Sequence, residues 1–241
     1  MTGTFINVIA VVIGSAIGIL LGHRLPEKVR ETVLNGLGLM VIVVGLSMAL
    51  QTKNVLIPMF SVLLGGIIGE LLRIEDGLHA VGEWLEQRTS RYLGGGEEGT
   101  IVQAFVTASL VFCVGPLAIL GSMQNGLTGD YNLLAVKSML DGFASLAFAA
   151  ALGPGVILSA LPVFLYQGSI SLAAMGLGSV LGEVTRQTPW VIEMTATGGI
   201  LVMGIGLLLL DLKRIRVGNL LPAVAIAPLI VVILARQGVS Y

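Results

Sequence analysis

The chain has 241 residues, of which 55% are hydrophobic and only 11% are charged, and its mean hydropathy is +0.96. A soluble domain carries about 25% charged residues, so this composition excludes an ordinary soluble protein. The net charge is −1 and no basic block occurs, which excludes nucleic acid as an expected partner. The apolar runs reach membrane-spanning length, so we predict an all-α, polytopic integral membrane protein.

Eight apolar segments of about 20 residues follow one another along the chain, and each is long enough to span a bilayer. Their approximate bounds are 4–22, 33–50, 55–72, 101–122, 133–158, 168–184, 190–210 and 219–234. Counting residues 162–174 separately would make nine. The polar stretch 73–99 has Leu78, Val81 and Leu85 at helical spacing and ends in Gly94–Gly96, so we predict a surface amphipathic helix followed by a linker.

The Lys and Arg residues of the short loops predict the orientation. With the N-terminus outside, the basic stretches 23–31, 73–99 and 213–216 are cytoplasmic, and the loop 123–132, which has no basic residue, is external. Nine spans would place residues 213–216 outside, so eight spans are favoured. The first segment has neither a basic flank nor a small-residue cleavage site, and we expect it to remain in the membrane.

Two central segments share one pattern. FVTASLVFCVGPLAIL begins at Phe105 and FASLAFAAALGPGVIL begins at Phe143. Each reaches a Gly-Pro pair at the same spacing, Gly115–Pro116 in the first and Gly153–Pro154 in the second. Proline removes a backbone donor and disfavours helix at the preceding residue. We therefore predict a central pair of broken helices over residues 100–160.

The segments on either side of this pair resemble each other in order and spacing. GSAIG at Gly14 resembles GSVLG at Gly178, and GLMVIVVGL at Gly38 resembles GILVMGIGL at Gly199. VLIP before the third span likewise resembles NLLP before the last. These matches predict that residues 1–72 and 168–236 are three-helix repeats of opposite orientation within a single membrane domain. Chance alignment of apolar segments is the alternative.

The strongest candidates for a binding site are Lys137 and Asp141, which share a helix face because they lie four residues apart. Burying either charge alone costs about 2.5–3.5 kcal/mol, so we expect them to pair or to face a hydrated cavity. An interfacial Lys137 with a structural Asp141 is the alternative. The other candidates supply hydroxyl, amide or freed backbone groups near the two breaks: Ser122, Gln124, Asn125, Gly115, Pro116, Gly153 and Pro154.

These candidates do not determine whether the ligand is a cation or an anion. Freed carbonyl and amide oxygens suit a monovalent cation, whereas a helix that begins at Pro116 or Pro154 suits an anion. Glu193 follows Trp190 closely and is interpreted as an interfacial first-turn acid. The single cysteine, Cys113, excludes an intramolecular disulfide. No catalytic, metal-binding or phosphate-binding motif occurs, so we expect no enzyme activity, no metal and no cofactor.

Several stretches carry a resemblance to a known family: the opening FINVIAVVIGSAIGILLG, the core CVGPLAILGSMQNGL-x-GD, the K-S-x-L-D-G stretch and the terminal GNLLPA. Through them the sequence resembles the YqgA/YdfK-like family of uncharacterised bacterial inner-membrane proteins. This resemblance implies a multi-pass inner-membrane protein of unassigned activity, for which a sodium channel or pump role has been suggested.

Together these features predict a membrane transport protein, either a channel or a secondary transporter, for a small ion or polar solute. The alternative is a non-transporting membrane scaffold or assembly protein that binds other helices through glycine stripes. Gly14, Gly18 and Gly22 form one such stripe, which lets another helix approach closely. It would serve either a second copy of the chain or a helix of the same subunit.

Overall fold

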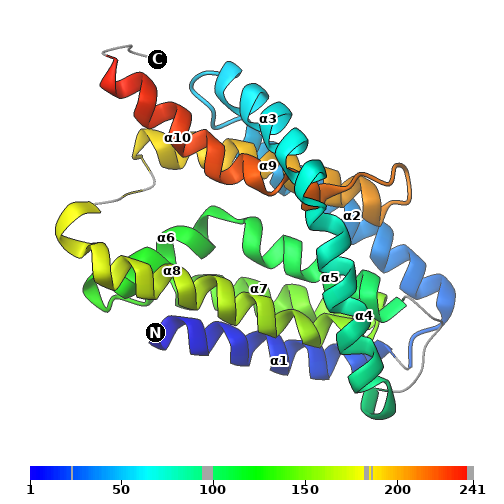
Figure 1. Cartoon of the computed structure of the whole chain (residues 1–241). Coiled ribbons are helices and arrows are strands. Elements are labelled where there is room, and N and C mark those ends of the chain that lie inside the picture. The colour runs from blue at the N-terminus through cyan, green and yellow to red at the C-terminus, as the bar shows by residue number, and fades with distance from the viewer. Residues whose placement is uncertain (23, 94–99, 182–184, 186, 238–241) are drawn as a thin grey trace. The chain divides into compact units, whose positions relative to one another are not determined.

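The computed structural model describes residues 1–22, 24–93, 100–181, 185 and 187–237, and every regular element in this part of the chain is helical (Figure 1). This confirms the all-α prediction. The elements are α1 (Thr2–Gly22), α2 (Glu27–Ala49), α3 (Leu56–Leu72), α4 (Ile74–Leu93), α5 (Thr100–Val114), α6 (Pro116–Thr128), α7 (Asn132–Leu152), the 3-10 helix η1 (Pro154–Ser159), α8 (Ala160–Leu181), α9 (Pro189–Leu209), the 3-10 helix η2 (Val217–Leu220) and α10 (Pro222–Arg236).

The helices have the length and composition of membrane spans. Among the described residues, six helices are long and apolar enough to cross a membrane, and there are up to eight spans if each of two bent helix pairs counts as one. A continuous helix satisfies its backbone hydrogen bonds internally, as a chain in hydrocarbon must. The protein is therefore a multi-pass membrane protein, and the predicted eight spans lie at the upper end of the observed range.

Helix α1 shows which of its faces the bilayer covers. Its exposed side chains are large and apolar and include Phe5, Ile9, Ile13 and Leu20. Its buried residues are small or polar, namely Gly3, Thr4, Asn7, Val11, Gly14, Ser15 and Gly18. A helix at the surface of a soluble protein has the opposite arrangement. The apolar face of α1 therefore suits lipid, and its polar face is turned into the protein.

The described residues form two compact units, and each is considered by itself. The first unit contains Met1–Leu37, Leu78–Cys113 and Leu117–Glu183. Within it α1 packs against both α7 and α8, and the three helices lie side by side (Figure 1). Helix α4 packs on α5 where Gly82 faces Val102 and Phe105. Residues 73–99 thus include the predicted helix, although its place on a membrane surface stays a prediction and Gly94–Gly96 lie outside the described residues.

The two Gly-Pro pairs behave differently, which corrects the prediction of two broken helices. At Gly115–Pro116 the chain bends by 59° between α5 and α6, as expected for a broken span. At Gly153 the backbone has φ +97°, a conformation that glycine adopts readily, and α7 ends there. Pro154 then begins η1, which leads directly into α8. The second pair is therefore a connection between two helices, and the span predicted at 168–184 begins much earlier, at Pro154.

The second unit contains Gly38–Gly77, Val114–Pro116 and Val184–Tyr241. Helix α10 packs against α3 and α9. Ile57 of α3 forms a buried hydrophobic cluster with Ala227 and Val231 of α10. The boundaries of these units do not coincide with the predicted repeats, since α1 and α8 lie in the first unit and α3, α9 and α10 in the second. The assignment of 1–72 and 168–236 as repeats stays a prediction.

One contact in the second unit agrees with that predicted repeat. Helices α2 and α9 cross through four glycines, and the sequence match pairs Gly38 with Gly199 and Gly45 with Gly206. A Cβ added at Gly45 would lie 2.7 Å from the carbonyl oxygen of Gly199, and one at Gly206 would lie 3.0 Å from that of Gly38. If each glycine is replaced by its predicted match in the other repeat, the Gly45–Gly199 contact becomes the Gly206–Gly38 contact. A two-fold relation between α2 and α9 requires this reciprocity.

Candidate functional site

The candidate site lies on one face of α7. Residues at helical spacing on this face are polar and buried, and they are Lys137, Ser138, Asp141 and Ser145. The opposite face is apolar and exposed, with Met139 and Phe143 at 67% and 72% of their full exposure. Lys137 and Asp141 are only 5% and 8% exposed. The charge of Lys137 is thus enclosed by protein, and its depth in the membrane stays a prediction.

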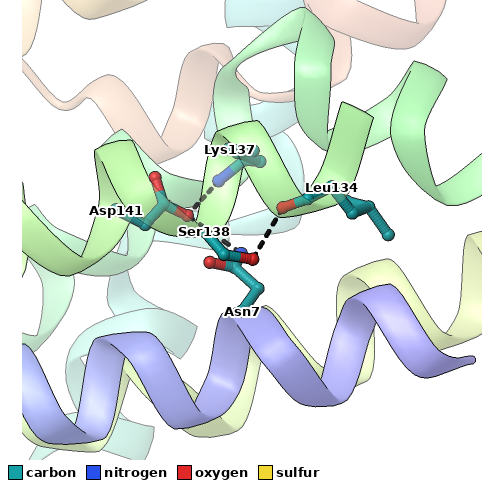
Figure 2. Close-up of polar contacts among 5 residues, drawn as sticks. All are labelled: Asn7, Leu134, Lys137, Ser138 and Asp141. Atoms are coloured by element: carbon teal, nitrogen blue, oxygen red, sulfur yellow. Dashed lines mark hydrogen bonds and ion pairs between the residues drawn. The ribbon is translucent and has the colours of Figure 1, made fainter. Parts of the chain in front are cut away.

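Lys137, Asp141 and Asn7 form a buried polar network (Figure 2). The ammonium group of Lys137 donates to Oδ2 of Asp141, one helical turn away. From α1, Nδ2 of Asn7 donates to the same carboxylate oxygen at 2.9 Å. Ser138 turns its hydroxyl to the carbonyl oxygen of Leu134 at 2.6 Å. The network joins α1 to α7 across residues that are far apart in the sequence.

The network is electrically matched but not fully hydrogen-bonded. The two opposite charges compensate each other, which is the condition under which charges are tolerated in a protein interior. The side-chain oxygen of Asn7, Oδ1, is buried and has no hydrogen-bond partner in the described structure. Among the described residues no group of three His, Cys, Asp or Glu side chains comes together as a metal site.

The glycines of α1 bring Asn7 within reach of Asp141. A Cβ at Gly14 would overlap the carbonyl oxygen of Gly142, and one at Gly18 would overlap that of Leu146. At Gly22 the added Cβ would lie 2.7 Å from the carbonyl oxygen of Ala150. All three glycines are therefore covered by α7 of the same chain. A second copy of the chain would have to use another surface, and the oligomeric state stays a prediction.

Helix α6 packs beside the first turn of α7, at Leu134. Leu134 contacts Gly3 of α1 and Gly121 of α6, where an added Cβ would lie 2.7 and 2.9 Å from its side chain. Next to this contact, Ser122 and Asn125 are 0% and 4% exposed. Gln124 is only half-buried. Ser122 and Asn125 are therefore buried on the helix that contacts α7 at Leu134, and their binding role stays a prediction.

The Gly153–Pro154 pair does not join this site as predicted, whereas a binding role for Gly115 and Pro116 stays a prediction. Gly153 lies at the far end of α7, about 18 Å from Asp141 at the helical rise of ~1.5 Å per residue. There Nε of Arg30 donates to the carbonyl oxygen of Ala151, so this end of α7 is held by a basic side chain. Gly115 and Pro116 belong to the second unit. A binding role for Gly153–Pro154 beside Lys137 and Asp141 is therefore not supported by the geometry.

Sequence reasoning did not select Asn7 or Gln167, which are 0% and 1% exposed. Asn7 lies within the first predicted span and Gln167 within the stretch 162–174 that could be a ninth span, and a polar residue in a span is costly unless it has a partner or a function. That signal was available in the sequence. What the sequence did not provide was the partner, because Asn7 and Asp141 are 134 positions apart.

Glu193, in the second unit, is buried by protein, and its predicted place at the membrane interface stays a prediction. It is 0% exposed. Its carboxylate accepts hydrogen bonds from the Thr52 hydroxyl at 2.6 Å, the Lys53 amide at 2.7 Å and the Asn54 amide at 3.3 Å. These amides precede α3 and have no helical partner. Glu193 therefore holds the connection between α2 and α3 in place.

This contact makes a prediction about stability. We expect Glu193→Ala to lower the free energy of unfolding by about 3 kcal/mol, because it leaves buried donors without an acceptor. Glu193→Gln retains an acceptor oxygen and should lose clearly less. Thermal unfolding of the purified protein in detergent micelles measures the difference, with the exposed Glu83→Ala on α4 as the control. Equal midpoints for Glu193→Ala and Glu83→Ala would show that the hydrogen bonds do not stabilise the connection.

Comparisons with known proteins agree with the resemblance seen in the sequence. The family model described as "Protein of unknown function (DUF554)" matches residues 2–232. The chain is 29% identical over 245 residues to the "Uncharacterized membrane protein YdfK" of Bacillus subtilis (strain 168), with complete coverage of both chains. It is 32% identical over 227 residues to the "Uncharacterized protein YqgA" of Escherichia coli (strain K12), covering 93% of this chain and 94% of that protein.

No solved structure matches the chain. Neither relative's name mentions sodium or any other transported solute. The suggested sodium channel or pump role therefore has no support from these comparisons.

Proposed function

Because this chain belongs to the DUF554 family, whose description assigns no function, we propose its function from its own buried site: it transports a small ion or polar solute across the membrane. One observation carries this proposal. Lys137 and Asp141 are buried as a charged pair on a helix whose other face is exposed and apolar. Ionisable residues inside membrane helices are costly and mark pathways for ions or solutes more often than they serve packing.

The chemistry of the pair suits transport because each partner can be exchanged for a ligand. A cation competes with Lys137 for the carboxylate of Asp141, and an anion competes with Asp141 for the ammonium of Lys137. Asn7 supplies a third polar group from a second helix. Relative movement of α1 and α7 would thus change the site directly. These features support a channel or a secondary transporter alike.

The predicted location follows from the same proposal. With the basic stretches 23–31, 73–99 and 213–216 in the cytoplasm the N-terminus is outside, and we propose the bacterial inner membrane as the location. The scaffold alternative relied on glycine stripes as binding surfaces for other proteins. The stripe on α1 is covered by α7, so the described residues favour transport over that alternative.

Flux measurements in proteoliposomes test the proposal. We expect the wild type to move at least one ion or polar solute from a panel under gradients of pH, salt or voltage. Asp141→Asn should abolish that flux, because the amide keeps the size of the side chain but removes the charge that holds Lys137. The matched control is Asp130→Asn, at an exposed position before α7. A monodisperse wild-type protein that moves no member of the panel would refute a transport function.

A further inference from the structure

Gln167 on α8 is the most completely unsatisfied buried side chain in the described structure. It is 1% exposed, and neither its Nε2 nor its Oε1 has a hydrogen-bond partner. A buried polar group without a partner costs about 1–3 kcal/mol. Such groups in native proteins call for a specific explanation, and a bound polar molecule is one of the few available.

The remaining unsatisfied atoms belong to the same unit as Gln167. Among the described residues, buried side-chain atoms without partners occur at Thr4, Asn7 and Ser15 on α1, at Ser122 and Asn125 on α6 and at Gln167 on α8. All of these residues lie in the first unit, and none lies in the second. Packing defects spread over the whole chain would not produce this distribution.

Contacts between the helices bring most of these atoms to one level. The tilted rings of Phe5 on α1 and Phe164 on α8 contact each other with centroids 5.6 Å apart, so Thr4 and Gln167 are on adjoining turns of neighbouring helices. Ser171, one turn beyond Gln167, donates to the carbonyl oxygen of Ser122 at 2.9 Å. Thr4, Gln167 and Ser122 therefore lie at a similar height on α1, α8 and α6. Asn7, one turn after Thr4, connects this region to the charged pair on α7.

The free atoms define the chemistry of the ligand. Asn7 and Asn125 use their Nδ2 donors within the protein and keep their Oδ1 acceptors free. Gln167 offers both an acceptor and a donor, and the Thr4 and Ser122 hydroxyls can act as either. None of these groups is charged. The two charges of the site are already matched to each other, so a bare ion would have to break the Lys137–Asp141 pair in order to be compensated.

We propose that Gln167, Ser122, Thr4 and Asn7 form a binding site for a small uncharged solute that carries several hydroxyl or amide groups. This inference rests on the proposed transport function and names its substrate class. A solute of this kind donates to the amide oxygens and accepts from Gln167 without disturbing the ion pair. Gln167 is then a binding residue, contributed by a helix that the sequence did not connect with the site.

Thiol labelling tests the binding site without measuring transport. The protein has one cysteine, so Cys113→Ser provides a cysteine-free background. In that background we expect Gln167→Cys to react with N-ethylmaleimide in membrane vesicles. The control is Val163→Cys, one turn earlier on α8 and 0% exposed, which should stay unlabelled. We further expect urea or glycerol to slow the labelling of Gln167→Cys, and sodium chloride or choline chloride of equal osmolarity to leave it unchanged.

The outcomes separate the two proposals. Labelling that is slowed by urea or glycerol alone supports the uncharged-solute site, whether or not flux is found. No labelling of Gln167→Cys, labelling without protection, or protection by the salts alone would overturn it, and ion flux in the same preparation would leave the transport function standing. Gln167→Leu should lower the transport rate of uncharged solutes about tenfold, which is equivalent to one lost hydrogen bond. Its unfolding midpoint should be no lower than that of the wild type.

Discussion

Asp141→Leu is expected to lower the free energy of unfolding by about 3–5 kcal/mol, because it leaves the ammonium group of Lys137 buried without its partner. Lys137→Met should have a similar effect by leaving the carboxylate of Asp141 alone with Asn7. The double variant Lys137→Met/Asp141→Leu removes both charges and should lose much less than either single variant, since apolar replacement of a whole buried pair is often neutral. Thermal or denaturant unfolding in detergent micelles measures all four proteins as a double-mutant cycle.

The cycle also separates stability from function. The double variant should fold but transport nothing, because the site has lost the buried pair on which the proposed function rests and Asn7 has lost the carboxylate that holds it. Asp130→Leu, at an exposed position, is the control for replacing an aspartate by leucine. If the single variants unfold at the wild-type midpoint, the pair is not buried as a unit. If the losses of the two single variants simply add in the double variant, the two side chains do not interact.

Gly14→Leu is expected to cost about 3 kcal/mol or more, because the new side chain must enter the contact between α1 and α7. An added Cβ at this position already overlaps the backbone of Gly142 and the hydroxyl of Ser145. The helices would have to separate, and Asn7 would then lose its hydrogen bond to Asp141. Transport should therefore fall together with stability. The yield of folded protein and its unfolding midpoint measure the effect.

Two matched variants control this experiment. Gly36→Leu on α2 introduces the same side chain where an added Cβ would meet nothing within 4 Å, and it should be tolerated. Gly22→Ala tests the same stripe at a looser contact, 2.7 Å from Ala150, and should cost less than Gly14→Leu. Equal tolerance of Gly14→Leu and Gly36→Leu would show that α1 and α7 do not pack as closely as the structure has them.

The charged pair shows how far sequence reasoning reached into the site. Lys137 and Asp141 are one helical turn apart, so we expected them to pair or to face a hydrated cavity, and the structure has them paired. The third member, Asn7, was missed because its contact joins α1 to α7. Gln167 was missed for a related reason. A single glutamine in an apolar segment reveals its cost, but only the packing of α1, α6 and α8 reveals that other unsatisfied groups lie at the same level.

The Gly-Pro pairs show the opposite case, in which one repeated pattern predicted the same structure twice and the two structures differ. Gly115–Pro116 and Gly153–Pro154 have the same two residues at the same spacing from a phenylalanine. Only Gly153 adopts a positive φ, and only there are the helices on both sides each long enough to span a membrane. The dipeptide permits both conformations, since glycine is almost equally stable in each. The choice depends on the surroundings, such as Arg30 at the end of α7.

The sequence by itself determined that this protein is a helical, multi-pass membrane protein with an ion pair on one of its spans. Those properties follow from local quantities, namely the length of apolar runs and the spacing of residues within one helix turn. Only the tertiary structure decided that Asn7 completes the pair, that Glu193 is buried, that the glycines of α1 are used within the subunit and that Gln167 is buried without a hydrogen-bond partner. These properties depend on which helix faces meet, and a periodic pattern in one segment carries no information about its partner.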